Sequence, residues 1–158
     1  MKIGVISDTH LRSPSPVLIR IIEETFKGCD LILHAGDLVT GRVLTYLEAH
    51  GVTAVRGNMD LPEVTAALPA KRVIEAGGFQ IGLIHGFGAP RGLAEVLRRE
   101  FDRIDCLVFG HSHEPLNKKV GRELWFNPGT AGGSYRRGAT VGLLQVGKEI
   151  KGEIITIE

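Results

Sequence analysis

The stretch Lys2-Ile3-Gly4-Val5-Ile6-Ser7-Asp8-Thr9-His10 places an apolar segment directly before two candidate metal ligands. The residues from Lys2 to Ile6 have the composition of a buried strand. Asp8 and His10 follow two positions apart, and residues i and i+2 of an extended segment point to the same side. The stretch therefore predicts a strand whose carboxyl end presents a carboxylate and an imidazole to one ion.

Further polar fragments follow apolar runs later in the chain. They are Gly36-Asp37, Gly57-Asn58, Ile84-His85-Gly86 and Gly110-His111-Ser112-His113. Each alone is more often a turn or a helix cap. Ligands just past parallel strands, however, converge on one edge of an α/β sheet. Their joint occurrence in this order indicates a metal centre, with seven candidate ligands: Asp8, His10, Asp37, Asn58, His85, His111 and His113.

The chemistry of these seven side chains constrains the metal. Imidazole, carboxylate and amide without thiolate suit Mn, Fe, Co, Ni or Zn, whereas Ca²⁺ favours oxygen alone. Seven ligands exceed what one ion with an open position takes from a protein. Two divalent ions sharing a carboxylate fit better. After subtraction of two carboxylates and a hydroxide, the centre keeps a charge of about +1, which attracts phosphate.

Apolar periodicity predicts alternating strands and helices, followed by a strand-rich end. The first half contains strands at Lys2–Ile6, Leu31–Leu33 and Val52–Val55, a helix from Ser15-Pro16 to Gly28, and a helix from Thr40 to about His50. A loop around Leu61-Pro62 leads to a hairpin of Lys71–Glu75 and Phe79–Ile84.

A further helix opens at Pro90, with Leu93, Val96, Leu97 and Phe101 on one face, and Cys106–Phe109 forms a strand. The end of the chain reads as antiparallel strands at Leu116–Val120, Glu123–Phe126, Thr140–Val146 and Glu149–Ile157, with a glycine-rich loop from Asn127 to Gly138. Two sheets packed face to face, with helices outside, would bury both patterns. We expect an α/β (α+β) fold and a single domain over residues 1–158.

The composition excludes several function classes. The chain has 19 basic and 18 acidic side chains and a net charge of +1, so nothing drives it generally toward nucleic acid or anionic membranes. No apolar run approaches the ~20 residues that span a bilayer. Cys29 and Cys106 lack a CxxC partner, and the chain opens on a strand without a leader segment. We expect free thiols and a cytoplasmic protein.

The order of these motifs resembles that of the calcineurin-like metallophosphoesterases, in particular their small, single-domain bacterial and archaeal phosphodiesterase branch. The resemblance extends from Asp8 to Asn127-Pro128-Gly129-Thr130, which is similar to the Asn-Pro-Gly-Ser/Thr signature of that branch. It implies a four-layer α-β-β-α sandwich of two mixed sheets, with the metal site at the carboxyl-terminal edge of the strands.

The resemblance also implies roles for individual residues. One ion would take Asp8, His10, Asp37 and His113, and the other Asp37, Asn58, His85 and His111. Asp37 would bridge the ions, of which Mn is favoured, and a bridging hydroxide would attack phosphorus. The implied catalytic residues are Asp37, Asn58 and His85, and the implied substrate contacts are Asn58, Met59 and Arg137. The reaction would be hydrolysis of small phosphodiesters.

Three residues near the motifs carry separate expectations. Many family members have histidine after the Gly-Asn pair, where it protonates the leaving oxygen, but this chain has Met59. Since methionine donates no proton, we expect a preference for diesters with good leaving groups. His34 precedes Gly36-Asp37 and is expected to support the site from outside. His50 ends a helix and is expected to interact with its dipole or to lie on the surface.

Other functions remain open alternatives. The retromer subunit that shares the family fold has lost metal ligands and binds proteins, so a non-enzymatic scaffold is one alternative. A phosphomonoesterase and a nuclease are others, although the chain has no spare length for a clamp on nucleic acid. A small phosphoester is the expected partner, with neither membrane nor nucleic acid. Association into a dimer or tetramer is also open.

Overall fold

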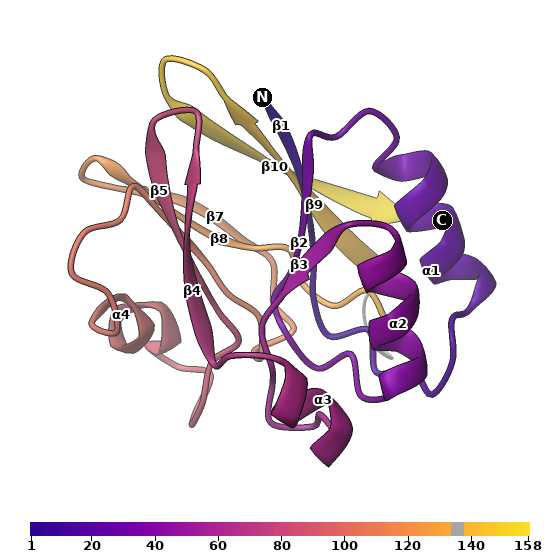
Figure 1. The fold of residues 1–158 in the computed structure, drawn as a ribbon. Coiled ribbons are helices and arrows are strands. Elements are labelled where there is room, and N and C mark those ends of the chain that lie inside the picture. The colour runs from indigo at the N-terminus through magenta and orange to yellow at the C-terminus, as the bar shows by residue number, and fades with distance from the viewer. Residues whose placement is uncertain (134–137) are drawn as a thin grey trace.

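Two five-stranded sheets pack face to face in the computed structural model, which describes residues 1–133 and 138–158 (Figure 1). The first sheet has the order β10-β9-β1-β2-β3. Its central strands are parallel: β1 (Lys2–Ile6), β2 (Leu31–His34) and β3 (Val52–Ala54). The antiparallel strands β9 (Ala139–Val146) and β10 (Ile150–Ile157) complete one side. The parallel centre directs the ends of β1, β2 and β3 toward one edge.

The second sheet has the order β4-β5-β6-β8-β7. Its strands are β4 (Lys71–Ala76), β5 (Phe79–Ile84), β6 (Cys106–Val108), β7 (Leu116–Val120) and β8 (Glu123–Asn127). The predicted hairpin of β4 and β5 is confirmed. The prediction for β8 is only half right: β8 is antiparallel to β7 but parallel to β6. Its buried, continuously apolar segment Leu124–Phe126 suits this central position.

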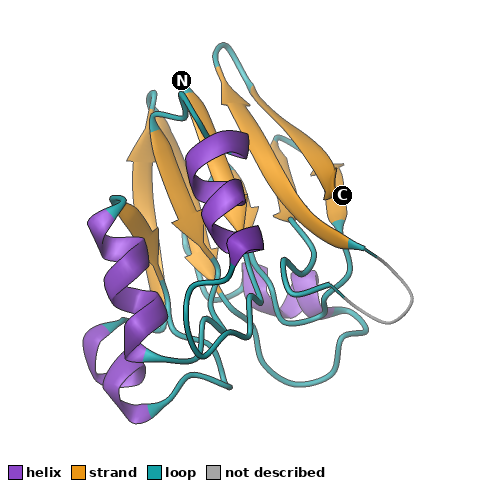
Figure 2. Cartoon of the chain, turned by 90° about the vertical axis from the view of Figure 1, so that its right-hand side faces the viewer, coloured by secondary structure: helices purple, strands orange, loops and turns teal. Residues whose placement is uncertain are grey.

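Helices cover the outer face of the first sheet, as the purple ribbons in front of the strands show in Figure 2. The helix α1 (Pro16–Arg20) starts where predicted, because the Ser15 hydroxyl accepts a hydrogen bond from the backbone N–H of Leu18. It continues as the π-helical segment η1 (Ile21–Thr25). The helix α2 (Gly41–Ala49) starts at the predicted cap, Thr40.

The other two helices differ from the predictions. The helix α3 (Pro62–Ala67) occupies the segment that was expected to be a loop, since Pro62 suits a first helical position and Val64 anchors the short helix in the core. The helix α4 (Leu93–Arg98) starts after Pro90, because Gly92 adopts a left-handed conformation with φ of 68°. Val96, predicted to be on the buried face, is 42% exposed.

Three apolar layers separate the sheets and helices. One lies between the sheets and includes Val5 and Phe126, and another packs α1, α2 and α3 on the first sheet. The third places Leu93 and Leu97 of α4 on the outer face of the second sheet. The predicted α/β fold, a sandwich of two mixed sheets between helices, is therefore confirmed.

Two further expectations concern the cysteines and the membrane-spanning segments. Neither cysteine of the chain is in a disulfide: Cys106 is buried and Cys29 is half-buried. None of the helices in the described part of the chain combines the length and hydropathy needed to cross a bilayer.

Candidate metal centre

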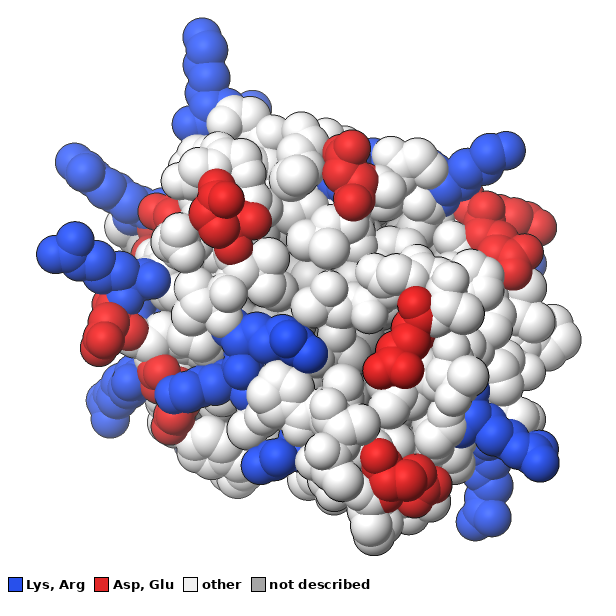
Figure 3. Space-filling model, in the orientation of Figure 1, with Lys and Arg blue, Asp and Glu red and all other residues white. Residues whose placement is uncertain are grey.

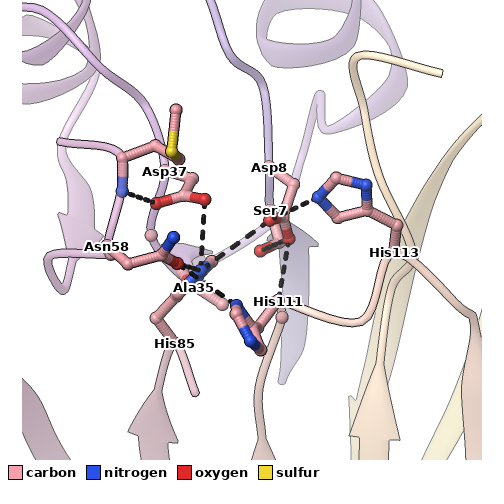
Figure 4. Close-up of polar contacts among 12 residues, drawn as sticks. Ser7, Asp8, Ala35, Asp37, Asn58, His85, His111 and His113 are labelled. Carbon is pink, nitrogen blue, oxygen red and sulfur yellow. Dashed lines mark hydrogen bonds and ion pairs between the residues drawn. The ribbon is translucent and has the colours of Figure 1, made fainter. Parts of the chain in front are cut away.

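The seven predicted ligands come together at one edge of the sandwich, and Figure 4 labels all of them except His10 with their contacts. Each lies on a segment that follows a strand: Asp8 and His10 after β1, Asp37 after β2, Asn58 after β3, His85 after β5, and His111 and His113 after β6. Both sheets thus contribute, because their parallel strands end on the same side. That these residues bind metal stays a prediction.

Most of the ligands sit in a strained backbone conformation. Left-handed φ angles occur at Asp8 (53°), His10 (48°), Asp37 (60°), His111 (67°) and His113 (59°). Such a conformation costs about 1–3 kcal/mol for a residue other than glycine and persists where the surroundings enforce it. Here the backbone N–H of Asp8 donates to Gly36 O, and that of His10 donates to Asp37 O, each at 3.0 Å. Clustered strain of this kind is typical of functional sites.

Asp8, His10 and His113 form the first part of the centre. Asp8 Oδ1 lies 3.1 Å from His113 Nε2 and 3.7 Å from His10 Nε2. The two Nε2 atoms lie 3.3 Å from each other. One carboxylate oxygen and two imidazole nitrogens therefore converge closely enough to share one cation.

Asp37, Asn58, His85 and His111 form the second part. His85 Nε2 lies 3.2 Å from Asp37 Oδ2 and 3.0 Å from Asn58 Oδ1. Asn58 Oδ1 also lies 3.2 Å from His111 Nδ1. Asp37 Oδ2 is 3.7 Å from His10 Nε2 in the first part, so Asp37 reaches both parts. This is the position that a bridging carboxylate requires.

The second part holds its imidazoles in the tautomers that metal ligation needs. His85 Nδ1 lies 2.7 Å from Ala35 O, and His111 Nε2 lies 2.8 Å from Gly88 O. Because a carbonyl oxygen only accepts, each of these nitrogens carries a proton. When the rings are neutral, the lone pairs of His85 Nε2 and His111 Nδ1 therefore point toward the centre and are available to an ion.

The electrostatics favour ionised carboxylates. Burial alone would raise the pKa of Asp8 and Asp37, but hydrogen bonding to His10 and His85 respectively outweighs it and lowers both pKa values. Conversely, hydrogen bonding to Asp8 raises the pKa of His10. Burial works to lower the pKa of His85, yet its interaction with Asp37 raises it overall. The ionised carboxylates of Asp8 and Asp37 thus favour positive charge beside them, here on the neighbouring imidazoles.

One buried atom tests whether these residues fit a metal ion. Asp8 Oδ1 is the one buried side-chain polar atom in the described part of the chain that has no hydrogen-bond partner. An ionised oxygen in that position is costly unless a cation compensates it. With nitrogen and oxygen donors around it and no thiolate, the cluster fits a divalent transition metal.

Asp60 supports the centre and was missed by the sequence analysis. Its carboxylate accepts three backbone N–H groups: those of Asp37 at 3.2 Å, Val39 at 2.6 Å and Gly57 at 2.7 Å. It thereby ties the loop after β2 to the loop after β3. Its place two residues after Asn58, in a turn segment, was the available signal.

The Asn127–Thr130 signature supports the loops around Asp8 and His111. Asn127 Nδ2 donates to Gly110 O at 3.0 Å and to Ser112 Oγ at 3.1 Å. Thr130 Oγ1 donates to Asp8 O at 2.8 Å. Both side chains are buried, so the signature holds the loops of predicted ligands and is not accessible to a substrate.

The two remaining histidines lie outside the ligand cluster. His34 is buried, and its Nδ1 accepts from Gly36 N at 3.1 Å while its Nε2 donates to Thr9 Oγ1 at 3.2 Å. Burial lowers the pKa of His34 to about 4, so the ring is neutral and braces two ligand loops. His50 caps the end of α2 at the surface, where its Nδ1 lies 2.8 Å from Tyr46 O.

Besides Asn58, the predicted substrate contacts are Met59 and Arg137, and the structure describes only Met59. The Met59 side chain is 55% exposed, and its backbone N–H donates to Asp37 Oδ1 at 2.8 Å. No proton-donating side chain stands at this position. Arg137 lies in segment 134–137, outside the described residues.

Glycines precede three ligands for two different reasons. Gly36 adopts a φ of 96°, as its place in a sharp turn requires. Gly57 and Gly110 are needed instead for close approach. A Cβ on Gly57 would lie 2.5 Å from Asp37 N, and one on Gly110 would lie 2.6 Å from Asp8 Oδ2.

Comparisons with known proteins agree with this geometry. Residues 1–149 match the family model of the calcineurin-like phosphoesterase superfamily domain. A probable metallophosphoesterase from Methanothermobacter thermautotrophicus is 36% identical over 159 aligned positions, which cover 98% of this chain and 92% of that protein.

Solved structures are similar over the whole chain. The structure of an archaeal phosphodiesterase superimposes with a TM-score of 0.77 at 25% identity, covering 98% of this chain and all of that one. The zinc complex of Vps29 from Entamoeba histolytica superimposes with a TM-score of 0.73 at 25% identity, covering 99% of each chain.

Proposed function

Because the chain belongs to the calcineurin-like phosphoesterase superfamily, we propose that it is a phosphodiesterase that hydrolyses small phosphodiesters with two divalent ions. The observation that carries the proposal is the convergence of all seven predicted ligands around Asp8 Oδ1, a buried oxygen without a hydrogen-bond partner. The similarity to an archaeal phosphodiesterase supports a diester substrate.

Each of the two ions would be held by its own set of residues. Asp8, His10 and His113 would hold one ion, and Asn58, His85 and His111 the other, with Asp37 shared. When bound, such ions activate water and polarise phosphoryl oxygens. Asn58 is exposed at the edge of the centre, where its amide can also donate to a phosphoryl oxygen. Mn is the favoured metal, with Ni, Fe, Co and Zn open.

Met59 supports a diester with a good leaving group. It stands where many family members carry the histidine that protonates the leaving oxygen, and the nearest contribution of Met59 to the centre is its backbone N–H. General acid catalysis is typically worth about 10²–10⁴-fold, so alkyl esters would react slowly.

The charge distribution supports a small substrate rather than nucleic acid. On the face shown in Figure 3, Lys and Arg side chains are interspersed with Asp and Glu over a surface that is otherwise uncharged. A nucleic-acid groove would instead present clustered cations. The absence of a disulfide between Cys29 and Cys106 supports a cytoplasmic site of action.

Self-association is part of the proposal because strand edges are available. β10 lies at the edge of the first sheet and β7 at the edge of the second. Pairing of such an edge with a second copy would give a dimer, and two such contacts a tetramer. Light scattering after gel filtration measures the number of copies.

One activity matrix tests the enzymatic proposal. Metal-stripped protein is supplied with Mn, Ni, Co, Zn or Mg and assayed on aryl diesters, aryl monoesters and cyclic nucleotides. We expect turnover of aryl diesters with at least one transition metal, and none for Asp37→Ala with any metal. Activity that survives in Asp37→Ala would refute the bridging role.

A protein-binding scaffold is the second candidate, because Vps29 shares the fold at 25% identity. The presence of all seven predicted metal ligands favours an enzyme over a scaffold. Tight binding of metal with no turnover of any phosphoester in the matrix would favour the scaffold instead.

A further inference from the structure

A cavity of about 330 Å³ adjoins the second part of the metal centre. Asn58 and His85 line both the centre and this cavity. A phosphoester seated at the centre would therefore have one of its organic groups directed into the cavity or across its mouth. The volume lies at the lower end of the range for small-ligand pockets, roughly 300–1,000 Å³.

Phe87 is the large apolar side chain exposed in this cavity. It is 49% exposed, whereas Ile84 in the same wall is only 6% exposed. Phe87 lies on the loop whose Gly88 carbonyl holds His111 Nε2 at 2.8 Å. The loop that orients a metal ligand thus also presents an aromatic ring beside the centre.

The charged groups at the rim of the cavity already have partners. Lys71 Nζ lies 3.3 Å from Glu100 Oε2, and it donates to Glu100 O at 2.7 Å. Arg56 Nη1 donates to Leu68 O at 3.3 Å. These side chains are therefore paired within the protein, and Phe87 is the large apolar side chain of the lining that is exposed to a ligand.

We propose that this cavity receives a flat aromatic group of the phosphoester and that Phe87 determines specificity for it. The inference rests on the proposed function, since it names the organic group of that substrate. An aromatic ring packed on Phe87 gains contact beyond simple area burial. An aryl ester and a nucleobase offer the same ring chemistry.

Binding of hydrolysis-resistant ligands tests the cavity without relying on turnover. Mn-loaded wild type, Phe87→Ala and Phe87→Tyr are titrated calorimetrically with phenylphosphonate and methylphosphonate. We expect Phe87→Ala to weaken phenylphosphonate binding about three- to tenfold. Methylphosphonate binding should change less than about twofold, and Phe87→Tyr should retain wild-type preference. Val96→Ala, which removes a 42% exposed side chain from α4, is the matched control.

The same variants separate the two sources of the ring. A larger loss of kcat/KM on an aryl diester indicates an aryl group, and a larger loss on a nucleoside cyclic phosphate indicates a base. Equal effects of Phe87→Ala on both phosphonates, or no effect on either, would overturn the inference. Phe87-dependent binding without hydrolysis of any ester would keep the cavity assignment and refute the proposed function. Hydrolysis of an ester together with binding that does not depend on Phe87 would refute the cavity assignment and keep the proposed function.

Discussion

The carboxylate of Asp60 accepts a hydrogen bond from the backbone N–H of Asp37 at 3.2 Å, so the loop after β3 holds the proposed bridging residue of the loop after β2. The same carboxylate binds the N–H groups of Val39 and Gly57. Asp60 thereby fixes the spacing between Asp37 and Asn58, although it is not itself among the proposed ligands.

Asp60→Ala should lower both stability and metal affinity. Loss of hydrogen bonds to a charged acceptor should reduce the free energy of unfolding by about 2–4 kcal/mol. Mn affinity should fall at least about tenfold, because hydrogen-bond partners that hold metal ligands in place commonly contribute that much. Urea unfolding of the metal-free protein and calorimetric Mn titration measure the two effects. Asp105→Ala is the control, since Asp105 accepts Gln80 N at 2.7 Å in the second sheet. It should lose stability while keeping Mn affinity.

Gly110→Ala should disrupt the centre, because the new Cβ would lie 2.6 Å from Asp8 Oδ2. We expect a loss of about 1–3 kcal/mol in the free energy of unfolding, as in other overpacked sites. Gly147→Ala is the matched control, since no atom would lie within 4 Å of its Cβ. Thermal unfolding of both variants is the measurement. Equal stability of the two would contradict the close approach between Gly110 and Asp8.

The raised imidazole pKa values predict how metal binding depends on pH. The pKa of His10 and of His85 lies above the ordinary 6.5. Their protonation therefore stabilises the metal-free protein fully below pH 6.5, and this contribution is lost as the pH rises through the raised values. Because an ion competes with these protons, Mn affinity should increase over the same interval, by up to tenfold per pH unit for each proton displaced.

The two carboxylates act at the other end of the pH range. The pKa of Asp8 and of Asp37 lies below the ordinary 3.8, so their contribution to stability is present above pH 3.8 and is lost at lower pH. His34 has a pKa of about 4, so its contribution is present above pH 6.5 and lost as the pH falls toward 4. Measuring Tm with and without Mn at each pH gives the Mn-dependent increase in Tm. That increase should grow from pH 6 to pH 8, and an increase that shrinks would contradict the assignment.

Met59→His should supply the missing proton donor. Wild type should show a steep fall of kcat with the pKa of the leaving alcohol, because Met59 cannot protonate it. In Met59→His the dependence should flatten, with a gain of about 10²-fold or more for alkyl leaving groups. Met59→Gln is the control and should keep the steep dependence. A flat dependence in wild type would mean that another group already acts as the acid.

The sequence predicted the parts of this fold that local patterns encode. β1, the β4–β5 hairpin and the starts of α1 and α2 at Ser15 and Thr40 follow from apolar runs and capping residues. The six residues of α3 are too few to display a helical period, so Pro62 was interpreted as a loop residue. The parallel pairing of β8 with β6 depends on tertiary contacts that no local pattern records.

For the candidate site, the sequence predicted the ligands but not the groups that hold them in place. The ligand types and their order after strands pointed to seven side chains that the structure brings together. The position of Asp60 in a turn was visible, but its hydrogen bonds to Asp37 and Val39 were not predictable, because they depend on how the loop after β3 approaches the loop after β2. Short polar fragments identify a centre more readily than the groups that position it.

The most direct test of the central claim is an anomalous difference map from a crystal grown with Mn²⁺. We predict two peaks about 3.5–4 Å apart. One should lie among Asp8, His10 and His113, the other among Asn58, His85 and His111, with Asp37 touching both. A single peak, or two peaks that Asp37 does not bridge, would contradict the account.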